Sequence, residues 1–159
     1  MTDAGRDGKT LAGLSRRTIL GAGAALVVLG RPSAAQATPE SMAAALKQFT
    51  QGGSVQEGRV RLDLPPLVEN GNSVPVTIAV DSPMTEADHV RRIALFNQKN
   101  PQPEVVRFTL GPRAGRAAVS TRIRLADTQT VIAVAELSDG SFWSARADVI
   151  VTLAACVES

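Results

Sequence analysis

Most of the chain between Val60 and Leu153 consists of short runs in which apolar and polar side chains alternate. Turn signals such as Asn70-Gly71-Asn72 and Ser138-Asp139-Gly140-Ser141 separate these runs, at intervals of about ten residues. A period of two is that of a half-buried strand, and several short strands at this spacing are typical of a sandwich. The pattern therefore predicts an all-β fold, a single antiparallel Ig-like β-sandwich.

Two residues carry further expectations about this sandwich. Pro75 lacks a backbone N–H, so it indicates an edge position or the start of pairing, and we expect Trp143 to lie in the core. The predicted strands cover residues 60–64, 74–80, 90–96, 106–110, 119–125, 131–137, 142–147 and 148–153.

One short amphipathic helix is predicted before the first strand. Thr38 and Pro39 favour a helix start, because threonine caps an early N–H and proline suits the first helical position. Gly52-Gly53 ends the helix. Two interpretations of its apolar stripe stay open, a cover for the domain's own core and a surface for a partner. The stripe consists of Met42, Ala45, Leu46 and Phe49.

Residues 1–37 have the order of a cleaved export signal: basic, apolar, then small. Arg16-Arg17 precedes an apolar run over residues 19–29, which is too short to span a membrane, and Ala35-Gln36-Ala37 supplies a small-x-small cleavage pattern. The paired arginines are similar to those of a twin-arginine signal. The alternative is an ordinary secretory signal that contains two arginines. Either signal predicts export, here to the periplasm.

The charge balance changes when this leader is removed. The whole chain has 17 basic and 15 acidic residues, of which the leader holds five and two. The mature chain therefore has 12 basic and 13 acidic residues, a net charge of −1. We expect no nucleic-acid partner, because such a partner requires clustered basic charge, and no membrane association of the mature chain.

Cys156 is the only cysteine and lies three residues from the carboxyl end. It cannot form an internal disulfide, so in an exported protein it indicates a reactive thiol or intermolecular pairing. A buried, inert cysteine is the third interpretation. With one cysteine and one histidine, His89, the usual four-ligand Cys/His zinc site is excluded, and we expect no metal and no cofactor.

The sequence lacks the constellations of an enzyme. It has no Gly-x-Ser-x-Gly elbow and no glycine-rich phosphate loop between a strand and a helix. His89, alone beside Asp88, is interpreted as a surface residue. The remaining feature is a thiol on a terminal arm, predicted over residues 154–159 after a domain over 38–153. Free after Thr152, this arm would project the sulfur by roughly 13 Å, as in a carrier that delivers a bound group.

The chain resembles the SoxY family over nearly its whole mature length. The resemblance rests on the Ser15-Arg16-Arg17 leader and on motifs spread over the domain. These motifs are Glu69-Asn70-Gly71-Asn72-Ser73-Val74-Pro75-Val76, Val80-Asp81-Ser82-Pro83-Met84-Thr85, Asn100-Pro101-x-Pro103, Val119-Ser120-Thr121-Arg122-Ile123-Arg124-Leu125-Ala126 and Ser138-Asp139-Gly140-Ser141-Phe142-Trp143.

This resemblance implies a sulfur carrier of the periplasmic thiosulfate-oxidising (Sox) system, with Cys156 as the sulfur attachment site. It implies a heterodimer with SoxZ and an Ig-like sandwich. It also implies transient partners, namely a Sox cytochrome that joins thiosulfate to the thiol, a hydrolase and a sulfur dehydrogenase. The carrier itself would not be an enzyme.

The tail departs from the family, whose cysteine lies between pairs of glycines. Here Ala154-Ala155 precede Cys156, and Val157-Glu158-Ser159 follow it. Alanine and valine restrict the backbone, and Glu158 brings negative charge near an anionic substrate. We expect slower loading by thiosulfate than for a glycine-tailed carrier. The alternative is a non-covalent Ig-like binding module, a divergent paralogue without carrier activity.

Overall fold

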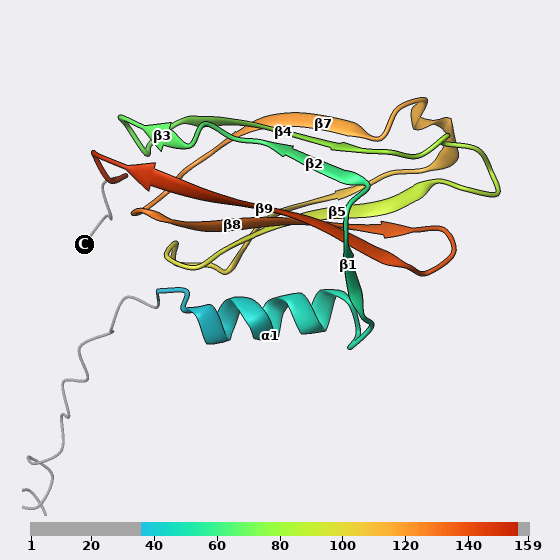
Figure 1. Ribbon diagram of the computed structural model, residues 1–159, viewed down its shortest axis with the longest axis horizontal. Coiled ribbons are helices and arrows are strands. Elements are labelled where there is room, and N and C mark those ends of the chain that lie inside the picture. The colour runs from blue at the N-terminus through green and yellow to red at the C-terminus, as the bar shows by residue number, and fades with distance from the viewer. Residues whose placement is uncertain (1–35, 156–159) are drawn as a thin grey trace, which may run out of the picture. The chain divides into compact units, whose positions relative to one another are not determined.

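The computed structural model describes residues 36–155, which form a β-sandwich with one helix packed against one of its faces (Figure 1). The predicted sandwich is confirmed. The larger sheet contains β1 (Val55–Glu57), β9 (Phe142–Val151), β8 (Gln129–Leu137), β5 (Val90–Asn97) and β6 (Glu104–Thr109), in that order, and β3 (Leu67–Val68) also pairs with β9. The smaller sheet contains β2 (Val60–Asp63), β4 (Val74–Val80) and β7 (Ala118–Ile123). A 3₁₀ turn, η1, spans Pro112–Ala114.

The core lies between the two sheets and uses the alternation that the sequence shows. In β4 every second residue from Val74 to Val80 is buried, and the residues between face outward. The central strands β5 and β8 are buried on both faces in their middle parts, because the helix covers the outer face of their sheet. The largest fully buried apolar side chains are Phe96, Ile78, Ile93, Leu95, Leu125 and Leu137.

Two short strands, β1 and β3, were not predicted, and both pair in parallel with β9. Between them the chain crosses to the other sheet as β2, after Gly58 and Arg59, which both have positive φ. The sandwich is therefore antiparallel except along this edge. A further correction concerns β9, which is one strand over Phe142–Val151, whereas two strands were predicted there.

The helix α1 (Pro39–Phe49) begins as expected, with Thr38 as its cap. The Thr38 Oγ1 accepts a hydrogen bond from the Ser41 N–H, and the Ser41 Oγ accepts one from the Thr38 N–H. Phe49 is buried and lies edge-on to Phe96 and Phe142, with ring centroids 5.8 and 6.1 Å apart. The apolar stripe thus covers the domain's own sheet, which decides between the two open interpretations.

Pro75 lies where β4 pairs with β7 only, since the pairing of β4 with β2 begins at Thr77. This local edge is the position that its missing N–H predicts. Trp143 is half-buried and packs against the core cluster, so its predicted place in the core is only partly confirmed. Its ring packs at the margin under the Arg59 guanidinium, 5.6 Å from the ring centroid, and its Nε1–H donates to the Ser141 Oγ.

Candidate functional site at the root of the C-terminal tail

The tail leaves the sandwich at the end of β9, and its first residues are hydrogen-bonded to neighbouring loops. The Thr152 N–H donates to the Val68 carbonyl at 3.0 Å, and the Leu153 carbonyl accepts from the Gly71 N–H at 2.9 Å. The Ala155 N–H donates to the Leu125 carbonyl at 3.2 Å. The backbone is therefore held at residues 152, 153 and 155, so the tail is attached to the domain beyond the end of the strand.

Gly71 is at the centre of this arrangement. It lies in the turn after β3, where the Asn70 Oδ1 accepts from the Asn72 N–H, and its own carbonyl accepts from the Leu125 N–H at 2.8 Å. A Cβ at this position would collide with the Leu125 carbonyl oxygen and would lie 2.9 Å from the Ala155 nitrogen. Only glycine allows this close backbone approach. We name the backbone of Gly71 and Leu125, with the hydrogen bonds to Leu153 and Ala155, the tail clamp.

The two alanines of the predicted arm differ in their surroundings. Ala154 is exposed, whereas Ala155 is 6% exposed. Leu153 points its side chain to solvent, with 62% exposed, although its carbonyl is bonded. The reach of roughly 13 Å expected for an arm free after Thr152 is therefore too long for this structure, because Leu153 and Ala155 are bonded to the domain.

The remaining site predictions fall in different places. Cys156 and Val157 lie outside the described residues, as do Arg16 and Arg17 of the leader. His89 is described, and its N–H donates to the Ser138 Oγ at the β8–β9 turn. The tail root is at the opposite end of β9 (Figure 1), and a ten-residue strand is roughly 30 Å long. The structure therefore places His89 far from the root of the tail.

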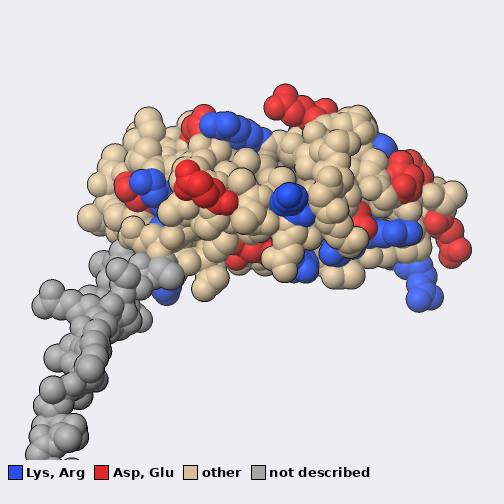
Figure 2. Space-filling view, turned by 90° about the horizontal axis from the view of Figure 1, so that it is seen from below, with Lys and Arg blue, Asp and Glu red and all other residues tan. Residues whose placement is uncertain are grey.

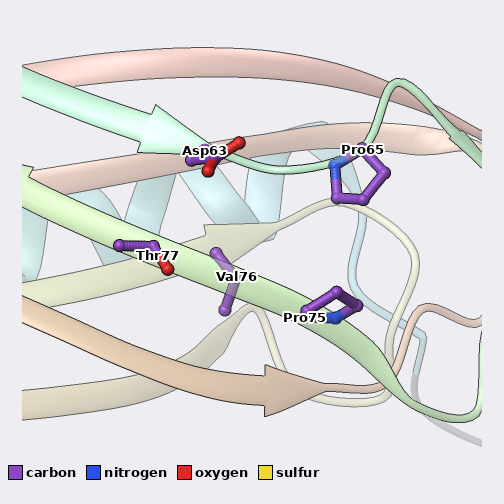
Figure 3. A pocket seen from close by; sticks show the side chains of 5 residues that line it. All are labelled: Asp63, Pro65, Pro75, Val76 and Thr77. Atoms are coloured by element: carbon purple, nitrogen blue, oxygen red, sulfur yellow. The ribbon is translucent and has the colours of Figure 1, made fainter.

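Other surface pockets of the described residues do not have the predicted site residues Ala154 and Ala155 in their lining. A pocket of about 120 Å³ is lined by Asp63, Pro65, Pro75, Val76 and Thr77 (Figure 3), so one carboxylate is its only ionisable group. Over residues 36–155 no three metal-binding side chains cluster, and no helix in this range is long and apolar enough to cross a membrane. On the face shown in Figure 2, basic and acidic side chains are interspersed, without the basic stripe that nucleic acid requires.

Three carboxylates of the described residues have a lowered pKa, and none of them is part of the tail clamp. Hydrogen bonds from Ser141 lower the pKa of Asp139 in the β8–β9 turn, and a hydrogen bond from Thr130 lowers that of Asp148 on β9. A backbone hydrogen bond lowers the pKa of Glu40 at the start of α1. Each carboxylate is held by hydrogen bonds in a local structural role.

Sequence reasoning identified Gly71 as a turn residue and did not connect it with the tail. Leu125 was predicted only as part of a strand. Gly71 and Leu153 are more than 80 positions apart in the sequence, and Leu125 and Ala155 are 30 positions apart. No local sequence pattern indicates contacts of this kind. The glycine within Glu69-Asn70-Gly71-Asn72 was the available signal, since glycine in a turn allows either positive φ or close backbone approach, and the structure shows the second.

The described part of the chain is thus a β-sandwich whose last residues are held to it by the tail clamp, and Cys156 follows them in the sequence. The family model for "Sulfur oxidation protein SoxY" matches residues 46–156, which include Cys156. The chain therefore belongs to the SoxY family. No curated protein matches it.

Solved structures agree with this assignment. The sulfur carrier protein SoxY from Chlorobium limicola f thiosulfatophilum matches with a TM-score of 0.60 and 29% identity, over 72% of this chain and 98% of that one. A superoxide reductase (neelaredoxin) from Ignicoccus hospitalis matches with a TM-score of 0.53 and 19% identity, over 59% of this chain and 80% of that one. At this identity the second likeness concerns the fold alone.

Proposed function

We propose that this chain is a covalent sulfur carrier in thiosulfate oxidation and holds sulfur intermediates on Cys156. The observation that carries the proposal is the family match that extends through Cys156, immediately after a residue bonded to the domain. The relative from Chlorobium limicola f thiosulfatophilum is itself described as a sulfur carrier protein. The chain acts as a carrier and leaves the chemistry to the enzymes that dock on it.

The resemblance supplies the reaction that the thiol would undergo. The Cys156 thiolate is the nucleophile. Joining it to thiosulfate forms an S–S bond, releases the thiol proton and transfers two electrons to the Sox cytochrome. The hydrolase then uses water to release the terminal sulfonate as sulfate, leaving one sulfur on the cysteine. The sulfur dehydrogenase then acts on the sulfur that remains on the cysteine. The carrier supplies the attachment point and the protein surface that these enzymes recognise.

The test is the intact mass of the protein from cells grown on thiosulfate, measured before and after treatment with a reductant. A carrier has a mass increase that the reductant removes, and the increase maps to the peptide that contains Cys156. A bare thiol, in cells where a glycine-tailed carrier is loaded, would contradict the proposal and favour the non-covalent binding module. A covalent dimer on a non-reducing gel would indicate the third use of this thiol, intermolecular pairing.

We further propose that the chain forms a heterodimer with SoxZ through the apolar surface beside the tail root. Leu67 and Ile150 are partners in the β3–β9 register, so they lie side by side, and they are 57% and 56% exposed. Leu153, two residues beyond β9, is 62% exposed. Two large exposed apolar side chains that lie side by side, with a third three residues further along the chain, support a protein interface.

Replacing Leu67 with glutamate is expected to weaken SoxZ binding by about tenfold or more, because a charge would be buried in an apolar contact. The measurement is a titration of SoxZ by calorimetry or surface plasmon resonance. The control is Gln48→Glu, which adds the same charge at an exposed position on α1. Equal affinity of the two variants would place the SoxZ interface elsewhere.

We also propose periplasmic export through the twin-arginine leader, which requires a cleavage site that is accessible in a folded precursor. Ala37 is 4% exposed, and its N–H donates to the Asn100 carbonyl at 2.7 Å. Thr38 belongs to the capping box of α1. Cutting between them would require both arrangements to open. Ser33 and Ala35 form a second small-x-small pattern, and a cut after Ala35 leaves these contacts intact.

Ser33→Leu is therefore expected to block processing, because it places a bulky side chain three residues before this cut. Ala34→Leu places a leucine at the middle position of the small-x-small pattern, where residue size matters less. We expect this variant to be processed normally. Intact mass of the periplasmic protein identifies the new amino terminus, which we expect at Gln36. An amino terminus at Thr38 in both variants would show that cleavage follows Ala37. Unprocessed wild-type protein in the cytoplasm would contradict export.

A further inference from the structure

We propose that the tail clamp makes Ala155 a positioning residue, which fixes the point on the domain from which the chain continues to Cys156. This inference rests on the proposed carrier function, since it concerns how the sulfur is presented. A clamped tail differs from a freely swinging arm in how far the thiol extends from the domain. Access to the thiol then depends on whether the clamp is closed or open.

The clamp is a closed set of backbone hydrogen bonds rather than one contact. Gly71 and Leu125 are joined by the hydrogen bond from the Leu125 N–H to the Gly71 carbonyl, at 2.8 Å. Both residues of this pair also bind the tail. The Gly71 N–H donates to the Leu153 carbonyl, and the Leu125 carbonyl accepts from the Ala155 N–H. The tail is thus held at alternate residues, as a short strand is held by a neighbour. Opening the clamp at Ala155 breaks the last bond before the cysteine.

The side chain of Ala155 adds to this attachment. Its methyl group is buried, whereas the methyl of Ala154 is exposed. A glycine at position 155 would lose the buried methyl and would gain backbone freedom in the open state. The same change at position 154 would add backbone freedom without removing any burial. The alanine before the cysteine therefore stabilises the closed clamp in a way that glycine does not.

The clamp shortens the distance that the thiol can travel. Free after Ala155, the backbone reaches Cys156 within about 3.8 Å, whereas an arm free after Thr152 spans roughly 13 Å. A partner enzyme must therefore meet the thiol near the surface of the domain, or it must break the hydrogen bond between Ala155 and Leu125. An enzyme with a deep, narrow channel reaches this thiol only through the open clamp.

The test compares Ala155→Gly with Ala154→Gly in the full mature chain. Each variant is allowed to react with iodoacetamide in solution and with maleimide fixed to beads by a short spacer. The short spacer requires the thiol to extend from the domain, whereas iodoacetamide does not. We expect Ala155→Gly to raise capture by the beads about tenfold, with the iodoacetamide rate nearly unchanged. Ala154→Gly should raise capture by the beads only about two- to fivefold, from backbone freedom alone, and should leave the iodoacetamide rate nearly unchanged.

Hydrogen exchange supplies a second readout that does not depend on the thiol. The amide at position 155 should be protected in the wild type and in Ala154→Gly, and less protected in Ala155→Gly. Equal bead capture by the two variants, or an unprotected amide at position 155 in the wild type, would overturn the inference. If these results are as expected but Cys156 never carries sulfur in cells, the clamp stands and the carrier function fails.

Discussion

Cys156→Ser is expected to abolish sulfur transfer completely. The thiolate is the reacting species, and a serine hydroxyl neither ionises near neutral pH nor forms an S–S bond. The measurement is thiosulfate-dependent electron transfer to the Sox cytochrome, in a reconstituted system that contains the variant and SoxZ. Since position 156 follows the last residue of the tail clamp, we expect the variant to keep its fold and its affinity for SoxZ.

The same variant separates the two classes of function. A carrier without its thiol loses all turnover, whereas a non-covalent binding module keeps its partner and its effect. Retained thiosulfate oxidation with Cys156→Ser would contradict the carrier proposal. A circular dichroism spectrum and a SoxZ titration are the controls, because a loss of fold would also remove turnover.

Gly71→Ala has the second large expected effect, on stability and on the tail together. The added methyl would collide with the Leu125 carbonyl and crowd the Ala155 nitrogen, both of which are backbone atoms that cannot rotate away. Overpacking of this kind typically costs 1–3 kcal/mol, so we expect the free energy of unfolding to fall by about 2–3 kcal/mol. Urea unfolding measures the loss, and faster carboxypeptidase digestion of the tail would report release of the clamp.

Gly111→Ala is the matched control for this change. A Cβ at Gly111 meets nothing within 4 Å, and its backbone lies in the extended region, where alanine is unstrained. We expect stability within about 1 kcal/mol of the wild type, with a small gain from the reduced freedom of the unfolded chain. A similar stability for both variants would mean that the Gly71 turn moves aside without cost. The tail clamp would then be weaker than its geometry indicates.

The strands that sequence patterns predict well are those with a regular alternation and clear turn signals on both sides. Val74 to Val80 lies between Asn70-Gly71-Asn72 and Asp81-Ser82-Pro83, and the structure places β4 there. The strand β9 was divided in two between Ala147 and Asp148, although apolar and polar residues alternate through this point. The long pairing with β8 continues through this point, so tertiary hydrogen bonds decide the strand length.

The short strands β1 and β3 show the limit of local reasoning. Each has two or three residues, too few for a period to be visible, and each exists because β9 offers an unpaired edge. The half-burial of Trp143 has a similar origin. A tryptophan is expected in a core on average, but here the crossing from β1 to β2 places Arg59 over its ring.

By itself the sequence determined the class of fold, the helix with its cap, and the cysteine as the residue to which function is assigned. It could do so because alternation, capping residues and a solitary thiol are local features. The tertiary structure alone decided that Gly71 and Leu125 hold the tail as far as Ala155. The reason is physical: these contacts join backbone atoms far apart in the sequence. Such contacts form only when the two sheets bring the turn, the loop and the end of β9 to the same place.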